Sequence, residues 1–276
     1  MPISSNARIH PTAIIDPQAD IEDDVQIGSF VVIEGPVKIG SGTIVHERVS
    51  LHGPLSIGID NQIGIGSVIG TRPQHLGYKG GDLGTVIGDG NIIREYITIH
   101  RAYLTGAQTK VGNHNFLMVG SHIGHDSVVG NHCILANGCM LGGHAEMQDR
   151  SFLSGNAGVH QFNRIGRLAI VSGLSVVTRD LPPFMMAYDR NHVIGLNIVG
   201  MKRAGMTREE LRIVSKAFHI LFRGESIQSL TLDRLKSEMG SEPLVQEILH
   251  FYQTSRRGCM RPLRVKKKNE TLDDVD

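Results

Sequence analysis

The chain has no tryptophan, and only 5% of its 276 residues are aromatic. Together with 33 glycines, this composition is unusual for a helical bundle and suits a tightly turned β architecture. Cysteine is also scarce: Cys133, Cys139 and Cys259 are an odd number and lack the spacing of a metal site. We therefore expect buried or free thiols in a reducing compartment, which favours the cytoplasm.

Long apolar runs and excess charge are absent as well. No stretch of roughly eighteen apolar residues could span a bilayer, and residues 1–8 lack the hydrophobic core of a signal peptide. The chain has 28 Lys+Arg against 27 Asp+Glu, a net charge of +1, which gives no reason to expect a nucleic acid partner. These absences argue against a membrane-spanning protein, a protein exported by a signal peptide and a nucleic-acid-binding protein.

What the sequence does have is a repeat of six residues. From Ile3 to Val177, twenty-seven of thirty positions spaced six apart are aliphatic, and glycine often follows them. Such hexapeptides are typical of a parallel β-helix, in which three of them close a triangular coil of eighteen residues. The aliphatic residue points inward, and residues eighteen apart become neighbours on coils roughly 4.8 Å apart. We predict a mainly β protein with this solenoid over residues 1–182.

The repeat loses its aliphatic residue at His75, Gly81 and Thr105 but keeps its phase. We interpret residues of about 71–86 and 102–110 as loops ejected from the coil, and long loops on rigid scaffolds commonly carry function. The pattern stops at Asp180-Leu181-Pro182-Pro183, because paired prolines break regular structure.

Residues 183–262 are expected to form a small α-helical C-terminal domain. Thr207-Arg208-Glu209-Glu210 has the spacing of a capping box and precedes apolar residues on one face. A second amphipathic run covers about Leu232 to Met239, and Ser241-Glu242-Pro243 begins a third. The charged tail, residues 263–276, is expected to be disordered.

The eighteen-residue spacing brings residues that could act in catalysis together on neighbouring coils. It places His125 beside Gly143 on the next coil and Asp126 beside His144. A histidine can take a proton from a hydroxyl, and an adjacent carboxylate can orient its ring. The unshielded N–H of Gly143 could stabilise an oxyanion. The polar residues that gather along these coils are His122, His125, His144, His160 and Gln161.

Two other interpretations of this cluster remain open. Outward-facing histidines of a β-helix can simply hydrate its surface. Three histidines can also bind a zinc ion, as in a hydratase. Against zinc, the pairing of Asp126 with His144 already occupies two candidate ligands, and no third histidine stands in the right column. We expect no metal.

At these residues the chain resembles a known family, the UDP-N-acetylglucosamine O-acyltransferases that begin lipid A synthesis. The resemblance covers about residues 8 to 260. Its most specific segments are His122-Ile123-Gly124-His125-Asp126, Gly143-His144, Val159-His160-Gln161-Phe162, Asp180-Leu181-Pro182-Pro183 and Gly200-Met201-Lys202-Arg203.

The resemblance implies a homotrimer of left-handed β-helices with active sites between subunits. The implied reaction transfers an (R)-3-hydroxyacyl group from acyl carrier protein to the 3-position of UDP-N-acetylglucosamine. It needs no cofactor of its own, because the carrier's phosphopantetheine bears the acyl group. His125 would be the base, Asp126 would orient it, and the Gly143 amide would hold the oxyanion. The implied substrate contacts are His122, His144, His160, Gln161 and Gln74, with Asn197 and Arg203 nearer the nucleotide and Gly173 limiting acyl length.

The chain departs from the family pattern at substrate-contact positions. The family usually carries Gln-Asp-x-Lys-Tyr in the first loop, where this chain has Gln74-His75-Leu76-Gly77-Tyr78; Val199 replaces the usual glutamate, and Ala204 a basic residue. The acceptor or acyl group could therefore differ, for example a 3-amino sugar. A paralogue that binds UDP-sugar without turnover is the alternative from another functional class. A basic face near Lys202, Arg203, Arg208, Arg212 and Lys216 could receive the acidic carrier protein.

Overall fold

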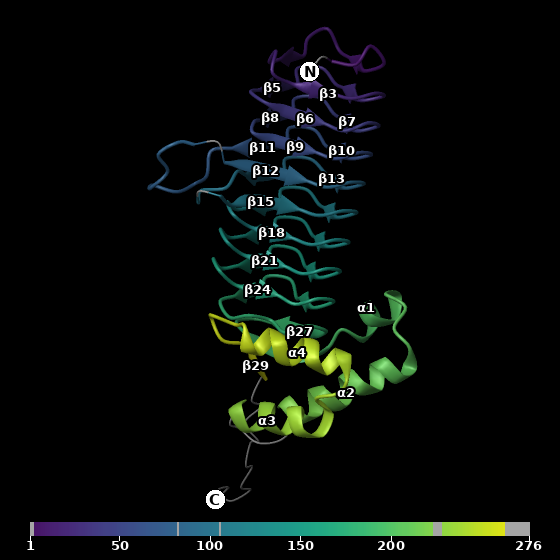
Figure 1. The fold of residues 1–276 in the computed structure, drawn as a ribbon, viewed down its shortest axis with the longest axis vertical. Coiled ribbons are helices and arrows are strands. Elements are labelled where there is room, and N and C mark those ends of the chain that lie inside the picture. Colours follow the sequence, from purple (N-terminus) through teal and green to yellow (C-terminus); the bar gives the residue numbers. More distant parts are fainter. Residues whose placement is uncertain (1–2, 82, 105, 223–227, 263–276) are drawn as a thin grey trace, which may run out of the picture.

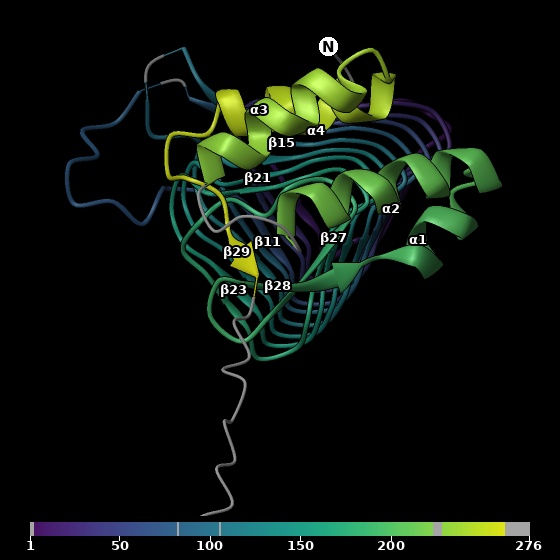
Figure 2. The same ribbon diagram turned by 90° about the horizontal axis from the view of Figure 1, so that it is seen from below.

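The computed structural model describes residues 3–81, 83–104, 106–222 and 228–262. They form a tall three-sided column of coils that carries four helices at its C-terminal end (Figure 1). Viewed along the column, the coils superimpose as a triangle and one pair of loops projects from it (Figure 2). The tail predicted to be disordered, residues 263–276, lies outside the described residues, as does Thr105.

Each side of the column is one sheet whose neighbouring strands come from successive coils. The first side contains β1 (Arg8–Ile9), β4 (Gln26–Ile27), β7 (Ile44–Val45), β10 (Gln62–Ile63), β13 (Ile92–Ile93), β16 (Phe116–Leu117), β19 (Ile134–Leu135), β22 (Phe152–Leu153), β25 (Ile170–Val171), β27 (Met185–Tyr188), β28 (His192–Leu196) and β29 (Arg261–Pro262). The second contains β2 (Ile14–Ile15), β5 (Val32–Glu34), β8 (Ser50–His52), β11 (Val68–Thr71), β14 (Thr98–His100), β17 (His122–Ile123), β20 (Met140–Leu141), β23 (Gly158–Val159) and β26 (Val176–Val177). The third contains β3 (Asp20–Ile21), β6 (Val37–Ile39), β9 (Leu55–Ile57), β12 (Gly84–Ile87), β15 (Gln108–Val111), β18 (Val128–Val129), β21 (Glu146–Met147) and β24 (Arg164–Ile165).

The register explains why the repeat keeps its phase across the loops. Ile21 pairs with Ile39, eighteen residues on. Ile57 pairs with Ile87, thirty residues on, and Ile87 pairs with Val111, twenty-four residues on. The two loops therefore add twelve and six residues, which are whole hexapeptides. In the structure the added residues lie between β11 and β12 and between β14 and β15, and β12 begins at Gly84 and β15 at Gln108, before the loop ends that we predicted.

The repeated aliphatic residues fill the interior. From Ile21 onward they are at most 3% exposed, and in the middle coils Ile63, Ile93 and Leu117 are 0–1% exposed. The core is thus a stack of aliphatic side chains that fixes every coil against its neighbours.

The corners of the coils also recur every six residues. The corner residue stands three positions after the aliphatic one and has a positive φ, for example 59° at Asp126, 60° at His144 and 65° at Phe162. This left-handed conformation is uncommon outside glycine, asparagine and aspartate. Because the three residues are eighteen apart, they occupy equivalent corners on successive coils, and their side chains project from the same edge.

The first sheet continues beyond the paired prolines, so residues 185–188 and 192–196, which we expected within the helical domain of residues 183–262, are strands. β27 joins β25 in parallel and β28 pairs with β27 in antiparallel fashion. Backbone hydrogen bonding extends the sheet here without the aliphatic hexapeptide, which is why the repeat gave no sign of these strands.

The helices follow this hairpin: α1 (Ile198–Arg203), α2 (Arg208–Phe222), α3 (Gln228–Met239) and α4 (Pro243–Gln253). The predicted capping box of α2 is confirmed, because the Thr207 N–H donates to Glu210 Oε2 at 2.6 Å and the Glu210 N–H donates to Thr207 Oγ1 at 3.2 Å. α4 begins at Pro243, as its sequence signal predicted. None of the helices within the described residues has the length and apolarity to cross a membrane.

The three cysteines are buried and free. Burial raises the pKa of the Cys133 and Cys139 thiols to about 11 and that of Cys259 to about 12. They therefore stay protonated and unreactive at neutral pH, which confirms the expectation of buried thiols.

Candidate active site

The site is built around His125 and Asp126, at the corner that follows β17. Asp126 adopts a φ of 59° there, and its N–H donates to Thr109 Oγ1 at 2.8 Å. His125 Nδ1 lies 2.6 Å from Asp126 Oδ2. A carboxylate only accepts hydrogen bonds, so Nδ1 carries the proton and Nε2 keeps its lone pair. His125 is thereby presented in the tautomer of a base.

The second loop holds the carboxylate from the other side. The N–H of Tyr103 donates to Asp126 Oδ2 at 2.8 Å, and the N–H of Leu104 donates to Oδ1 at 3.1 Å. Asp126 is 9% exposed and His125 is 5% exposed. Three N–H donors, including the imidazole, thus fix a buried carboxylate, and the carboxylate in turn fixes the ring plane of His125.

Gly143 lies against the His125 ring on the next coil, as the spacing predicts. The His144 N–H donates to the His125 carbonyl at 2.9 Å and sets this register. A Cβ added at Gly143 would lie 2.7 Å from both Nε2 and Cε1 of His125. Within the described residues, the Gly143 N–H donates to no protein acceptor. Only glycine leaves room for the His125 ring at position 143, and within the described residues the backbone N–H of this glycine is unpaired.

Two more histidines flank this pair. The rings of His125 and His144 lie edge to face, 5.0 Å apart, and His144 stacks on Phe162 at 4.4 Å. Burial lowers the pKa of His144, an effect that the Asp126 charge opposes. Burial, and then the charges of His100 and His125, lower the pKa of His122 to about 4. His122 is therefore neutral at neutral pH, and a neutral imidazole has one nitrogen that donates and one that accepts a hydrogen bond.

His75 and Tyr103, from the two loops, complete the wall of the site. Their rings stack at 3.8 Å, and each lies edge to face with His125, at 5.5 Å for His75 and 5.8 Å for Tyr103. The sequence marked His75 only as a departure from the family pattern and did not indicate Tyr103. Tyr103 is the sole aromatic residue of the second loop, and this was the only available signal. Gln74, adjacent to His75, is exposed.

The next coil places His160 and Gln161 near the same edge. His160 Nδ1 donates to the Gln161 carbonyl at 3.2 Å, and Arg257 lies 5.5 Å from the centroid of the Phe162 ring. Gly173 is exposed one coil further on, above Gly155, whose carbonyl oxygen would lie 3.3 Å from an added Cβ.

Two predicted contacts do not join the cluster within one chain. Asn197 caps α1: its Oδ1 accepts from the Gly200 N–H at 2.9 Å, and its Nδ2 donates to the Leu168 carbonyl at 2.8 Å. Arg203 ends the same helix. In both views α1 lies on the opposite side of the column from the loops (Figures 1 and 2). Both residues are thus remote from His125 of their own chain.

The zinc interpretation can be compared with this geometry. His125, Asp126 and His144 are the described residues that could hold a metal, with donor atoms within 4.8 Å of one another. Yet the 2.6 Å separation of His125 Nδ1 and Asp126 Oδ2 is that of a hydrogen bond, and both carboxylate oxygens already accept backbone N–H groups. The arrangement fits an oriented base better than a ligand set.

Comparison with known proteins agrees with this geometry. Residues 180–260 match the family model "Udp N-acetylglucosamine O-acyltransferase; Domain 2", and residues 18–53 and 108–143 match the bacterial transferase hexapeptide. An acyl-[acyl-carrier-protein]–UDP-N-acetylglucosamine O-acyltransferase of Thermodesulfovibrio yellowstonii is 42% identical over 255 residues, 92% of this chain and 99% of that protein. Its namesake from Synechocystis is 42% identical over 262 residues, 94% of this chain and 95% of that protein.

Solved structures agree as well. The UDP-N-acetylglucosamine acyltransferase of Francisella novicida superimposes with a TM-score of 0.89 at 34% identity, covering 97% of this chain and 100% of that one. The Arabidopsis UDP-N-acetylglucosamine acyltransferase gives a TM-score of 0.79 at 29% identity, covering 94% of this chain and 99% of that one. The parallel β-helix expected from the hexapeptide repeat is thereby confirmed. By sequence and by fold, the chain belongs to the UDP-N-acetylglucosamine O-acyltransferase family.

Proposed function

We propose that this protein transfers an (R)-3-hydroxyacyl group from the thioester of acyl carrier protein to the 3-hydroxyl of UDP-N-acetylglucosamine, the first step of lipid A synthesis. The observation that carries the proposal is the His125–Asp126 pair seated against Gly143. It combines a base in the correct tautomer with an unpaired backbone N–H.

The chain's residues give the reaction a balanced sequence of steps. His125 Nε2 takes the proton of the 3-hydroxyl as its oxygen attacks the thioester carbonyl carbon. The Gly143 N–H stabilises the oxyanion of the tetrahedral intermediate. When the intermediate collapses, the C–S bond breaks, the ester carbonyl forms, and the departing thiolate receives the proton from the His125 imidazolium. Asp126 holds the ring throughout and stabilises its charged form.

We further propose that the active unit is a homotrimer with its sites between subunits. Asn197 and Arg203 lie across the column from His125, so a second copy would have to supply them. Apolar side chains are exposed on the second sheet and its corners, including Met140 (56%), Val176 (45%) and Leu174 (79%), and such surfaces commonly mark interfaces. Buried free thiols are compatible with a cytoplasmic location.

The test is an acyl-transfer assay with a panel of hydroxyacyl carrier proteins and UDP-sugars. We expect an ester product with UDP-N-acetylglucosamine. We also expect a long acyl chain, because Gly173, the position that limits acyl length, is exposed and has no side chain that could block the chain. His75 beside His125 and Gly77 change the wall that would contact the acceptor, so the panel includes a 3-amino UDP-sugar. If the protein used only the 3-amino sugar, the proposed acceptor, UDP-N-acetylglucosamine, would be wrong. Binding of UDP-sugar without any product would instead indicate a non-catalytic paralogue.

A further inference from the structure

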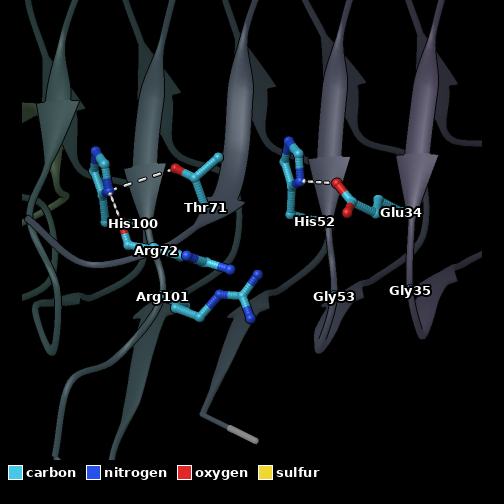
Figure 3. A pocket seen from close by; sticks show the side chains of 8 residues that line it. All are labelled: Glu34, Gly35, His52, Gly53, Thr71, Arg72, His100 and Arg101. Carbon is cyan, nitrogen blue, oxygen red and sulfur yellow. Dashed lines mark hydrogen bonds and ion pairs between the residues drawn. The ribbon is translucent and has the colours of Figure 1, made fainter. Parts of the chain in front are cut away.

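A cavity of about 600 Å³ lies beside the active site, on the N-terminal side of the His125 coil. Its eight lining residues are Glu34, Gly35, His52, Gly53, Thr71, Arg72, His100 and Arg101 (Figure 3). They come from β5, β8, β11 and β14 and from the residues that directly follow these four strands. In the sheet these strands directly precede β17, which carries His122.

Two guanidinium groups dominate the cavity. In Figure 3 the side chains of Arg72 and Arg101 extend in the same direction, and their guanidinium ends lie near each other in the view. Arg101 is anchored, because its Nε donates to the Gly70 carbonyl at 2.6 Å and its N–H to the Thr71 carbonyl at 3.0 Å. No protein acceptor within the described residues binds the Arg72 side chain or the terminal nitrogens of Arg101. In the part of the chain that the structure describes, these N–H donors are therefore left for a ligand.

Within the described residues, the other ionisable groups of the lining compensate this positive charge only in part. Glu34 is the single carboxylate among the eight described lining residues, and its Oε2 lies 2.9 Å from His52 Nδ1. His100 Nδ1 lies 2.6 Å from the Arg72 carbonyl, an acceptor, so Nδ1 carries the proton and Nε2 is free. The arrangement suits an anion with several acceptor oxygens, and arginine pairs bind phosphate well.

Contacts connect the cavity to the reacting groups. The His100 ring lies 5.3 Å from that of His122. Arg72 is three residues before His75, whose ring lies 5.5 Å from that of His125. β5, which carries Glu34, is four strands from β17, so the cavity extends roughly 5 to 20 Å along the column from the His125 coil.

We propose that this cavity binds the phosphodiester of the acyl donor's phosphopantetheine arm. This inference rests on the proposed function. Both substrates carry phosphate, but the pyrophosphate of a UDP-sugar is separated from the 3-hydroxyl by little more than the sugar ring. In phosphopantetheine the whole pantetheine chain separates the phosphate from the sulfur. A cavity that begins on the neighbouring coil and extends over four coils from His125 therefore fits the longer donor.

The test compares Arg72→Gln with wild type in the full-length protein. With the carrier-bound donor, we expect the donor KM to rise about tenfold, with kcat and the acceptor KM unchanged. Arg72→Lys should recover part of the loss, because it keeps the charge but not the planar fork. Lys79→Gln, an exposed cation of the same loop outside the cavity, is the matched control and should leave the donor KM unchanged.

A rise confined to the acceptor KM would reassign the cavity to the pyrophosphate. Unchanged KM values for both substrates, or equal rises in both KM values, would overturn the phosphate site. A binding measurement separates this result from failure of the proposed function. By calorimetry, phosphopantetheine should bind wild type about tenfold more tightly than Arg72→Gln, whereas pantetheine without phosphate should not distinguish them. That result would support the cavity even in a protein without turnover, and equal binding of phosphopantetheine would overturn it.

Discussion

Nδ1 of His125 lies 2.6 Å from Oδ2 of Asp126, and that carboxylate also accepts two backbone N–H groups from the second loop. The loop inserted between two coils thus completes the site that the coils begin. The pair is a unit, because removing the carboxylate would free both the ring and the loop backbone that it anchors.

Asp126→Asn should keep the shape of this corner but not its hydrogen bonding. An amide can turn its NH2 group toward His125, which would leave the proton on Nε2 and remove the base. We expect kcat to fall roughly 10³- to 10⁴-fold, as for the corresponding change in a serine triad, with little change in KM. Steady-state kinetics provide the measurement, and Asp233→Asn on α3, an exposed residue, is the control. A kcat within threefold of wild type would show that Asp126 does not orient the base.

Gly143→Ala tests the contact between coils. The added methyl would lie 2.7 Å from His125 Nε2, so the ring must move, and the amide would also be shielded. We expect a loss of roughly 100- to 1,000-fold in kcat, with circular dichroism unchanged. Gly195→Ala is the matched control, because an added Cβ there meets nothing within 4 Å. Full activity of Gly143→Ala would show that activity requires neither the space that Gly143 leaves for the His125 ring nor the Gly143 N–H as an oxyanion donor.

The contact between His125 and Gly143 could be predicted from the sequence because the inward aliphatic residues fix which positions of successive coils lie side by side. Ile123 and Leu141 both point inward and pair across coils, so the residues two positions later, His125 and Gly143, must meet as well. The placement of His75 and Tyr103 could not be predicted in this way. Loop residues are free of the inward aliphatic constraint, and their position depends on contacts such as the Tyr103 N–H to Asp126.

The hairpin of β27 and β28 was missed for a related reason. Its strands are held by main-chain hydrogen bonds to β25 and to each other, and these require no repeating side chain. The capping box at Thr207 and the proline at the start of α4 were, in contrast, local signals whose chemistry acts within a few residues. Features that depend on local chemistry or on the repeat could therefore be predicted from the sequence.

His122 should make stability depend on pH. Burial lowers its pKa to about 4 in the folded chain, against about 6.5 in the unfolded chain. The folded pKa is the lower one, so the unfolded state binds the proton more readily, and stability falls as the pH drops from about 7 toward 4. After allowance for its partial exposure, this histidine should contribute about 1 kcal/mol of the loss between pH 7 and 5.

Denaturant unfolding of wild type and His122→Gln at both pH values measures this contribution. The variant should lose less stability than wild type on acidification. His219→Gln, at an exposed histidine of α2, should behave like wild type. An identical pH dependence for His122→Gln and wild type would contradict a buried, neutral His122.

Asp180 should hold the helices to the column. Its side chain is buried and accepts from the Arg164 N–H at 2.9 Å, Arg164 Nε at 3.1 Å and Ser255 Oγ at 2.8 Å. Asp180→Ala would leave the partly buried Arg164 guanidinium without its carboxylate partner, so we expect a loss of about 3 kcal/mol in the free energy of unfolding. Asp233→Ala should change it by less than about 0.5 kcal/mol. Equal stability of the two variants would exclude the anchoring role.

The most direct measurement of the central claim is acyl transfer from a hydroxyacyl carrier protein to UDP-N-acetylglucosamine by wild type and His125→Ala. His125 supplies the proposed base, so the wild type should form the ester and the variant should lose roughly 10³-fold or more in kcat. Both proteins should bind UDP-N-acetylglucosamine with similar affinity. Normal turnover by His125→Ala would contradict the assigned mechanism.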